Sequence, residues 1–382
     1  MMDFAQEFTR KRRDELHLDE VIAEADRQIT ICNACRYCEG YCAVFPAIER
    51  RATFTPGDIA HLSNLCHDCR ACYYACMYAP PHEFAVNIPE ILSKVRIRTY
   101  DNYLGAGSDW LRRRLKGRTP IALTAALSLV LFIAVAGATK GVSALWHRPS
   151  TGSPYEVIPY AVLIAIMLAP FLFSVGVILR AGARYWTATH GPLRDLWNPA
   201  ALSQASAYAA QLHYLQGGGP NCYYPADVPS PMRRLLHSAT AYGFVLCVIA
   251  TTSAAIMQDI IGWQPPYGMV SLPVLSGIVG GAGLIVGSTG LIAMKARADR
   301  EPGDELETVA NYGFLVALDV LAATGILTLL LRHEAGFGIA LVIHLAAVAL
   351  CFLVAPYTKF VHFVYRYLAL VKDSLEVMAQ GV

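Results

Sequence analysis

Charged residues are scarce in this sequence of 382 amino acids, where they make up 16% of the positions. Soluble domains usually carry about 25%, so the composition disfavours a wholly soluble protein. Positive charge shows no large excess either, because 31 Lys and Arg residues nearly balance 29 Asp and Glu residues. We therefore expect no nucleic-acid partner. The first residues are basic but lack the apolar core of a secretory signal, and we expect this region to stay in the cytoplasm.

Cysteine is rare outside one short region, since eight of the eleven cysteines lie between Cys32 and Cys76. The remaining three are scattered, and we do not expect the isolated Cys222 to be a ligand. Thiols are kept reduced in the cytoplasm. Eight clustered cysteines in such a compartment favour metal or cluster ligation over disulfide bonds.

The clustered cysteines form one motif that occurs twice, with three cysteines at CxxC spacing and a fourth after three further residues. The second copy follows the first by 34 residues, and the two copies are Cys32, Cys35, Cys38, Cys42 and Cys66, Cys69, Cys72, Cys76. This spacing is that of the bacterial two-cluster iron–sulfur run, except that Pro46 and Pro80 stand four residues after the fourth cysteine instead of directly after it.

Three thiolates on one tight loop can hold three corners of a cubane, and the other motif then supplies the fourth ligand. The sequence thus predicts two [4Fe–4S] clusters, with the ligand sets Cys32, Cys35, Cys38, Cys76 and Cys66, Cys69, Cys72, Cys42. Structural zinc sites are the alternative, but these usually pair two cysteine knuckles that lie far apart in sequence.

The connector between the motifs, residues 43–65, contains "TPGDIAHLSNL", in which Pro56 and Asp58 are typical of the first turn of a helix. A long helical connector favours an α-helical ferredoxin domain over the compact type that contains β-strands. We predict that this domain occupies residues 1–118 and lies in the cytoplasm.

Six apolar stretches are each near the ~20 residues that span a bilayer. They cover roughly residues 120–139, 156–179, 235–257, 269–294, 311–331 and 337–357. Buried helices of a large soluble protein are the alternative, which six such stretches in one chain disfavour. We predict a mainly α fold, with transmembrane helices 1–2 in residues 119–181, a cytoplasmic loop in 182–232, and transmembrane helices 3–6 in 233–382. The fourth stretch is rich in glycine, which permits close helix packing.

Lys and Arg are distributed unevenly between the loops. The segment 112–118, the loops 180–234 and 295–310, and the C-terminal tail together hold sixteen, whereas the three alternate loops hold three. Because positive loops stay in the cytoplasm, we predict a multi-pass protein of the cytoplasmic membrane with both termini inside.

Three histidines, His237, His344 and His362, lie in or beside apolar spans, where ionisable residues usually have a function. Two imidazoles that face each other can bind both axial positions of a haem iron, although each one could equally bond a neighbouring helix. His344 and His362 are separated by eighteen residues, roughly 27 Å of helix, so they cannot share one haem. His237 and His362 both lie near cytoplasmic charges, and we predict that this pair holds a b-type haem.

Four further residues and one loop are weaker candidates. Asp319, within the fifth span, could serve a quinone proton path or bond a neighbouring helix, and Lys359 is a second candidate quinone contact. Arg233 and Arg234 could meet haem propionates or could be ordinary positive-inside residues. The loop 182–232 contains "AALSQASAYAAQLHYL", a predicted helix that Gly217–Gly219 would end. Three glycines can also form an anion-binding nest, but a helix stop is the simpler interpretation.

The doubled cysteine motif, "LHYLQGGGPNCYYP", "RRLLHSATAYGF" and "PYTKFVHFVYRYLAL" together resemble the citrate/tricarballylate utilisation protein B family over most of residues 27–375. The resemblance implies a membrane iron–sulfur and haem protein that takes electrons from a separate FAD-dependent enzyme, tricarballylate dehydrogenase, and passes them to the quinone pool. A separate flavoprotein agrees with the lack of a dinucleotide-binding glycine fingerprint in this chain.

The last two spans are also similar to the gamma subunit of respiratory nitrate reductase. In that family two histidines eighteen residues apart bind different haems, and their partners lie ten residues apart on an earlier span. This sequence has His237 at the first partner position but Cys247 at the second. The departure favours one haem at His237 and His362, and it leaves His344 without an obvious partner.

The favoured interpretation is therefore an electron carrier between a flavoprotein and quinone. A membrane subunit of another quinone-linked oxidoreductase, similar to heterodisulfide reductase or nitrate reductase, would have the same fold and a different partner. A membrane redox sensor or scaffold would have clusters but would need no haem.

Overall fold

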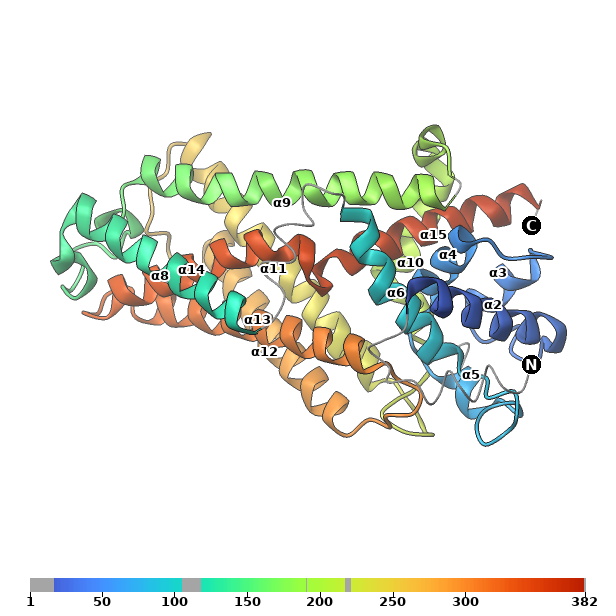
Figure 1. Cartoon of the computed structure of the whole chain (residues 1–382). Coiled ribbons are helices and arrows are strands. Elements are labelled where there is room, and N and C mark those ends of the chain that lie inside the picture. The colour runs from blue at the N-terminus through green and yellow to red at the C-terminus, as the bar shows by residue number, and fades with distance from the viewer. Residues whose placement is uncertain (1–16, 105–117, 190, 217–220, 381–382) are drawn as a thin grey trace.

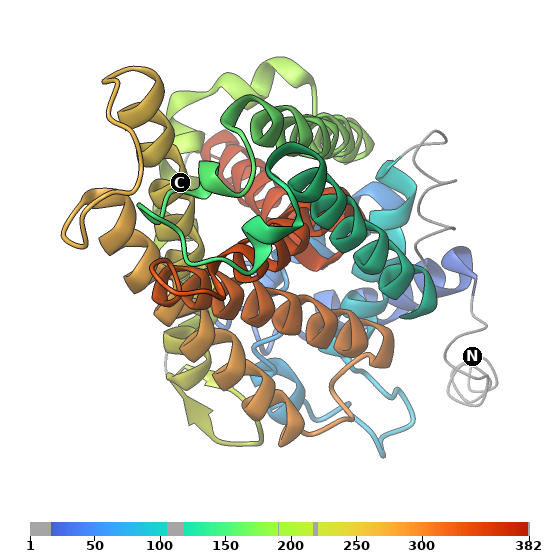
Figure 2. The same ribbon diagram turned by 90° about the vertical axis from the view of Figure 1, so that its left-hand side faces the viewer.

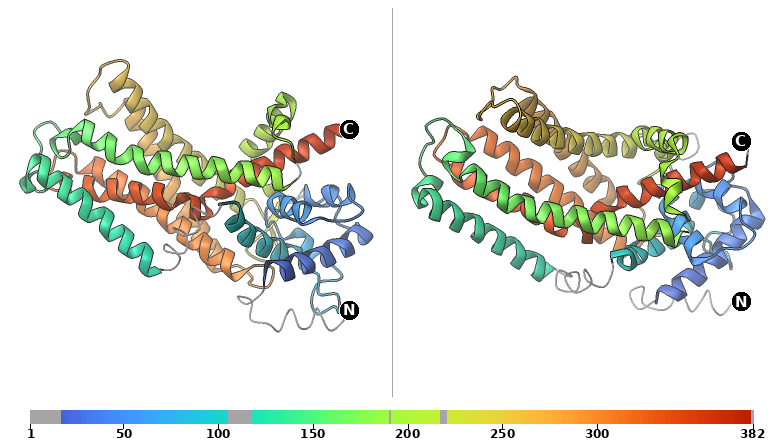
Figure 3. Two further views of the ribbon diagram at one scale, coloured as in Figure 1. Left: turned by 45° about the horizontal axis from the view of Figure 1, so that its top comes forward. Right: turned by 90° about the horizontal axis from the view of Figure 1, so that it is seen from above.

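The structure, a computed structural model, describes residues 17–104, 118–189, 191–216 and 221–380. These residues are mainly helical, as predicted (Figure 1). A group of short helices near the start of the chain lies at one end of a bundle of long apolar helices. Helix α15, His362–Ala379, leaves the bundle and runs alongside the short helices, which Figure 3 shows from two further directions.

Helices are the only regular secondary structure among the described residues of the N-terminal domain. It comprises α2 (Leu18–Cys35), α3 (Val44–Glu49), α4 (Pro56–Leu65), α5 (Ala71–Tyr74) and α6 (Ile88–Leu104). Helix α4 begins where the sequence predicts a helix start, because the Thr55 hydroxyl accepts a hydrogen bond from the Asp58 N–H while the Asp58 carboxylate accepts one from the Thr55 N–H. Ile29, Leu62 and Leu92 of α2, α4 and α6 are completely buried, so the helices share one apolar core.

Within the described parts of the chain, six helices are long and apolar enough to cross a membrane, as predicted. They are α8 (Arg118–Lys140), α9 (Tyr160–Ala188), α11 (Met232–Asp259), α12 (Leu272–Ala296), α13 (Glu305–Leu330) and α14 (Phe337–Val354), the last span continuing to Tyr357. Apolar side chains such as Leu127, Leu179 and Leu330 are exposed on them, as lipid contact requires. Helix α14 contacts α8, α9 and α13, while α12 lies between α11 and α13 (Figure 2).

Short elements connect these helices. They are the 3-10 helices η1 (Val142–Leu145), η2 (Pro154–Glu156), η3 (Leu193–Trp197), η4 (His213–Gln216), η5 (Ala355–Tyr357) and η6 (Lys359–Val361), helix α10 (Pro199–Gln211), and the antiparallel strands β1 (Cys222–Tyr223) and β2 (Pro229–Ser230). Helix α10 matches the helix expected in the loop 182–232. It ends at Gln211 with Leu212 in the left-handed conformation, earlier than the predicted stop at Gly217–Gly219, which lies outside the described residues.

Glycines bring α11 and α12 into close contact, as the sequence of the fourth span suggests. A Cβ atom on Gly287 would lie 2.6 Å from the Thr240 nitrogen and 2.7 Å from the Leu236 oxygen, both in the backbone of α11. Gly243 and Gly280 approach each other in the same way. Backbones can come this close only where no side chain intervenes. This contact fixes the position of α11, which carries His237.

Four tyrosines join the N-terminal domain to the bundle. Tyr100 and Tyr103 of α6 pack against Tyr365 of α15, with ring centroids 4.5 and 5.6 Å apart. Tyr185, near the end of α9, contacts Tyr103 and Tyr365 at 5.4 and 5.3 Å. Helix α9 continues seven residues beyond the predicted end of this segment at residue 181, so its last turns support the N-terminal domain.

Candidate metal centres

The two cysteine motifs fold in the same way at the residue that follows their second cysteine. Arg36 and Arg70, which are equivalent in the repeat, have φ values of 56° and 64°. Left-handed backbone is uncommon outside glycine. The Arg36 N–H donates to the Cys32 carbonyl at 2.9 Å and closes helix α2. In the first motif the left-handed residue therefore ends α2, whereas in the second motif Arg70 directly precedes helix α5.

The first thiol group lines one cavity. Cys32, Cys35, Cys38 and Cys76 all border it, and so does Cys72, which is assigned to the second group. Burial, followed by the nearby Cys76 and Cys35, raises the pKa of the Cys38 thiol to about 12. Cys76 comes from the second motif, so the structure brings the fourth thiol to the other three as the crossed assignment predicts. Cys35 is exposed, which places this group at the surface.

The second thiol group is deeper. Burial raises the pKa of the Cys42 thiol, and the neighbouring Cys69 and Cys66 add to the shift. The pKa of Cys72 is raised by burial and then by Cys69, Cys42 and Cys66. The structure thus gathers Cys42 with three thiols of the second motif. The Cys66 and Cys69 residues are only 6% and 7% exposed, in contrast to the exposed Cys35.

Both thiol groups suit a cluster with thiolate ligands. All eight cysteines are free of disulfide bonds, and each group draws three thiols from one loop and one from the other. Thiolates are soft ligands that select iron–sulfur clusters or zinc. Cys222 lies beside the second group, but its Sγ donates to the Leu215 carbonyl at 3.0 Å. That Cys222 is not a ligand stays a prediction.

A chain of polar contacts connects the second thiol group with the bundle. Arg96 of α6 donates to the Cys66 carbonyl at 2.8 Å and pairs with Glu307 of α13 at 2.8 Å. Glu307 also pairs with Lys359, which is 8% exposed. Desolvation lowers the pKa of Lys359 to about 8, although Glu307 opposes the shift. The Lys359 ammonium, a candidate quinone contact by sequence, is therefore held in a buried ion pair.

The same contacts reach the predicted haem ligands. His237 of α11 and His362, the first residue of α15, face each other with ring centroids 6.4 Å apart and planes at 80° (the T-shaped arrangement). Imidazole nitrogens bind a metal at about 2 Å, and with a further ~1 Å from nitrogen to ring centre, two imidazoles on opposite sides of one metal have centroids about 6 Å apart. The observed separation fits that arrangement.

The ring nitrogens also fit metal ligation. His362 Nδ1 lies 2.6 Å from the Lys359 carbonyl, which can only accept, so this nitrogen carries the proton and leaves Nε2 free to bind a metal. His237 Nδ1 is buried and has no hydrogen-bond partner among the described residues. A buried imidazole nitrogen without a partner is expected where a bound group is missing. These two histidines fit a bis-imidazole haem.

The other candidates by sequence have neighbours of their own. His344 Nδ1 lies 3.0 Å from the Thr324 hydroxyl of α13. Asp319 accepts hydrogen bonds from Ser288 and Thr289 of α12, as expected if it bonds a neighbouring helix. Neither contact tests a haem at His344 or a quinone path at Asp319, which stay predictions.

Arg233 and Arg234 are both engaged with protein groups. Arg233 donates to the Asp68 carbonyl, between Cys66 and Cys69, and its guanidinium lies 3.8 Å from the Asp68 carboxylate. Arg234 donates to the Gln211 carbonyl at 2.9 Å. These contacts favour neither as a haem propionate partner. The glycine nest at Gly217–Gly219 lies outside the described residues.

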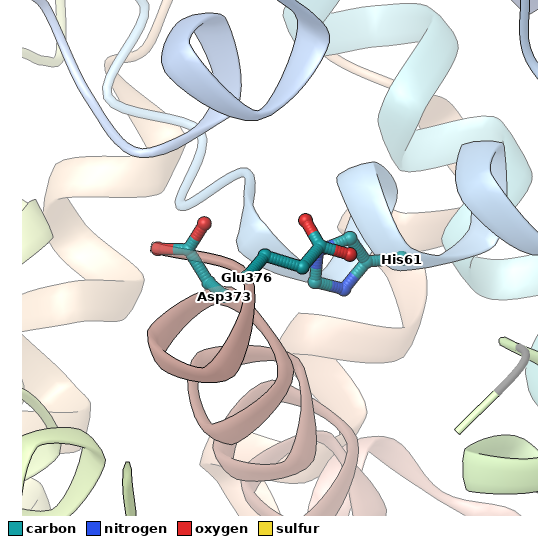
Figure 4. Close-up of side chains that lie close together, drawn as sticks. All are labelled: His61, Asp373 and Glu376. Carbon is teal, nitrogen blue, oxygen red and sulfur yellow. The ribbon is translucent and has the colours of Figure 1, made fainter. Parts of the chain in front are cut away.

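A different polar cluster joins α4 to α15 (Figure 4). Ligand atoms of His61, Asp373 and Glu376 lie within 4.8 Å of one another. Arg50 pairs with both carboxylates and Arg51 with Glu376, so these acids are already neutralised. We interpret the cluster as an ion-pair anchor for the C-terminal helix rather than as a metal site.

Four residues with a place in these contacts were not predicted from the sequence. They are Arg96, Glu307, His61 and Arg366. A signal existed for one of them. Arg366 follows His362 by four residues, so both side chains lie on the same face of α15. The partnership of Arg96 with Glu307 joins residues 211 positions apart and has no local pattern.

An all-helical cysteine domain on six candidate membrane spans defines a multi-pass membrane protein with a ferredoxin-like domain. Residues 25–102 match the model of the Citrate utilization protein B Fer4-like domain, and residues 114–382 match the model of Citrate utilization protein B. The Citrate utilization protein B of Escherichia coli is 40% identical over 362 residues, which cover 94% of this chain and 93% of that protein. No solved structure matches. The chain belongs to the Citrate utilization protein B family, which confirms the resemblance drawn from the sequence motifs.

Proposed function

We propose that this protein carries electrons from a reduced FAD-dependent dehydrogenase, with tricarballylate dehydrogenase as the favoured partner, to quinone in the cytoplasmic membrane. The Fer4-like domain and the six membrane spans support a redox protein that joins a soluble donor to a lipid-soluble acceptor. The facing pair of His237 and His362 carries the proposal, because a sensor or scaffold would need no such pair.

The proposal assigns residues to each cofactor. We assign one [4Fe–4S] cluster to Cys32, Cys35, Cys38 and Cys76, and a second to Cys66, Cys69, Cys72 and Cys42. A b-type haem is assigned to His237 and His362. Bound in this way, the two clusters and the haem would carry electrons one at a time. They would connect a flavin, which gives two electrons, with a quinone, which accepts two.

The order of the sites supports transfer from the soluble domain into the bundle. The first thiol group is exposed at Cys35, where a donor protein can approach. The second is buried, and Arg96 links the Cys66 carbonyl to Glu307 of the bundle. The Glu307–Lys359 pair then leads to His362. The protein contributes fixed positions and buried charge along this route.

The test is quinone reduction in membrane vesicles that contain this chain and the purified dehydrogenase. We expect reduction of quinone when the organic acid substrate is added, and none when the chain is omitted. Metal analysis of the purified chain should give eight iron and eight sulfide atoms in its clusters, as expected for two cubanes, and a b-type spectrum. Zinc in place of iron and sulfide would rule out the proposal.

A further inference from the structure

Arg366 of α15 is half-buried, and its Nη1 atom is inaccessible to solvent. Among the described residues, this nitrogen donates to no hydrogen-bond acceptor. Leaving a charged donor buried and unpaired is costly. A group that the protein binds is therefore expected to supply the missing anion.

The carboxylate of Glu307, whose charge acts on Arg366, is used by other cations. Glu307 pairs with Arg96 and with Lys359. Asp68 pairs with Arg233. Arg233 precedes His237 by four residues, and Arg366 follows His362 by four. The two arginines thus flank the histidine pair from α11 and α15, but only Arg233 has a protein anion.

The charge of Arg366 lies close to both the histidine pair and the second thiol group. Burial lowers the pKa of His362, and the charges of Lys359 and Arg366 add to that shift. Burial raises the pKa of Cys66, while Arg96 and, more weakly, Arg366 oppose the shift. The charge of Arg366 therefore acts both on a residue assigned to the haem and on a residue assigned to the second cluster.

We propose that Arg366 binds a carboxylate of the haem, at the porphyrin edge that faces the second thiol group. This inference rests on the proposed function, because it requires the haem at His237 and His362. A b-type porphyrin carries two propionates, and a guanidinium binds a carboxylate through two parallel hydrogen bonds. The contact would satisfy the buried Nη1 and would fix the rotation of the porphyrin about the axis between the two imidazoles.

Two variants of the full-length protein, Arg366→Gln and Arg366→Lys, test this role in detergent solution. Arg184→Gln is the matched control, because Arg184 is an exposed arginine near the end of α9. Each protein is made without haem and reconstituted with haem b or with its dimethyl ester, which lacks the carboxylates. The measured quantities are the rate of haem transfer to apomyoglobin and the reduction potential of the haem, with cluster iron and sulfide as the check on folding.

We expect Arg366→Gln to release haem b roughly 10- to 100-fold faster than the wild type, as for loss of a charged hydrogen bond. The potential should fall, because a positive charge beside the haem favours the reduced state. Arg366→Lys should recover part of both effects, and Arg184→Gln should match the wild type. The wild type should release the ester faster than haem b, whereas Arg366→Gln should release both at the same rate.

Two results would overturn the inference, and they differ from failure of the proposed function. If Arg366→Gln keeps the wild-type release rate and potential, or still discriminates between haem b and its ester, then Arg366 does not bind the haem carboxylate. A wild-type protein that takes up no haem refutes the haem assignment itself, and the role of Arg366 falls with it.

Discussion

At the scale of single residues, the assignment of His237 and His362 to the haem can be tested by substitution. We expect His237→Ala and His362→Ala each to abolish the b-type spectrum, because either change removes one of the two facing imidazoles. The clusters should remain, since their thiols lie in the other domain. Reduced-minus-oxidised spectra and iron and sulfide content measure both outcomes. His344→Ala should keep the full haem content, and loss of haem there would refute the pairing.

The crossed cysteine assignment can be tested with two serine variants. Cys42→Ser should remove the buried cluster and keep the exposed one, because Cys42 lies with Cys66, Cys69 and Cys72. Cys76→Ser should have the opposite effect, since Cys76 lines the cavity of the first thiol group. Electron paramagnetic resonance of the reduced proteins separates the two clusters. If the same cluster is lost in both variants, the ligands are not exchanged between the motifs.

His61 gives the fold a dependence on pH. Its ring is fully buried, both ring nitrogens lack partners among the described residues, and burial followed by the charges of Lys372, Arg51 and Arg50 lowers its pKa well below the usual value. The unfolded chain therefore binds a proton at pH values below about 6.5 that the folded chain does not bind. Stability contributed by neutral His61 is complete above pH 6.5 and falls as the pH drops, by up to about 1.4 kcal/mol per pH unit.

The variant His61→Phe isolates this contribution, because Asp373, Glu376 and the arginines that face His61 stay in place. We expect the melting temperature of the wild type to fall more steeply than that of His61→Phe between pH 6.5 and pH 5. Parallel curves for the two proteins would show that His61 is protonated in the folded state.

At the scale of helices, close packing of α11 against α12 should control the position of His237. Gly287→Ala would place a methyl group less than 3 Å from two backbone atoms of α11, which must move away. We expect a loss of about 1–3 kcal/mol of stability and weaker haem binding, measured by thermal unfolding in detergent and by haem content. Gly277→Ala is the control in the same helix, because its methyl group would meet only Ala250 at 3.7 Å. Equal effects of the two substitutions would contradict this view of the interface.

The helices show what the sequence could and could not predict. Some features have local signals in the sequence. Long apolar stretches predict the six spans, the Thr55–Asp58 capping box predicts α4, and the 34-residue repeat predicts the paired cysteine loops. Depth along the helices also predicted the pairing of His237 with His362, which the structure brings together. The continuation of α9 to Ala188 was missed, because its last turns are stabilised by tyrosines from α6 and α15. Contacts of this kind depend on tertiary structure and leave no local pattern.

At the scale of the whole molecule, one buried ion-pair group holds the cysteine domain against the bundle. Arg96 belongs to the domain and is completely buried, while Glu307 and Lys359 belong to the bundle. Each cation depends on the same carboxylate. Removal of Glu307 would leave two buried positive charges that repel each other beside the Cys66 carbonyl, which Arg96 also contacts. The distance between the second thiol group and the histidine pair should therefore depend on Glu307.

We expect Glu307→Ala to destabilise the docked arrangement by about 3–5 kcal/mol, the usual cost of breaking a buried pair. Both clusters and the haem should still be present, because no assigned ligand is changed, but electrons should pass from cluster to haem more slowly. Stopped-flow spectroscopy after reduction of the clusters measures that step. Glu334→Ala is the control, since Glu334 pairs with Arg148 at 3.6 Å in an exposed position where a salt bridge contributes little. Unchanged transfer in Glu307→Ala would mean that the remaining contacts hold the domain in place, namely the tyrosines of α6, α9 and α15 and the ion pairs of Arg50 and Arg51 with α15.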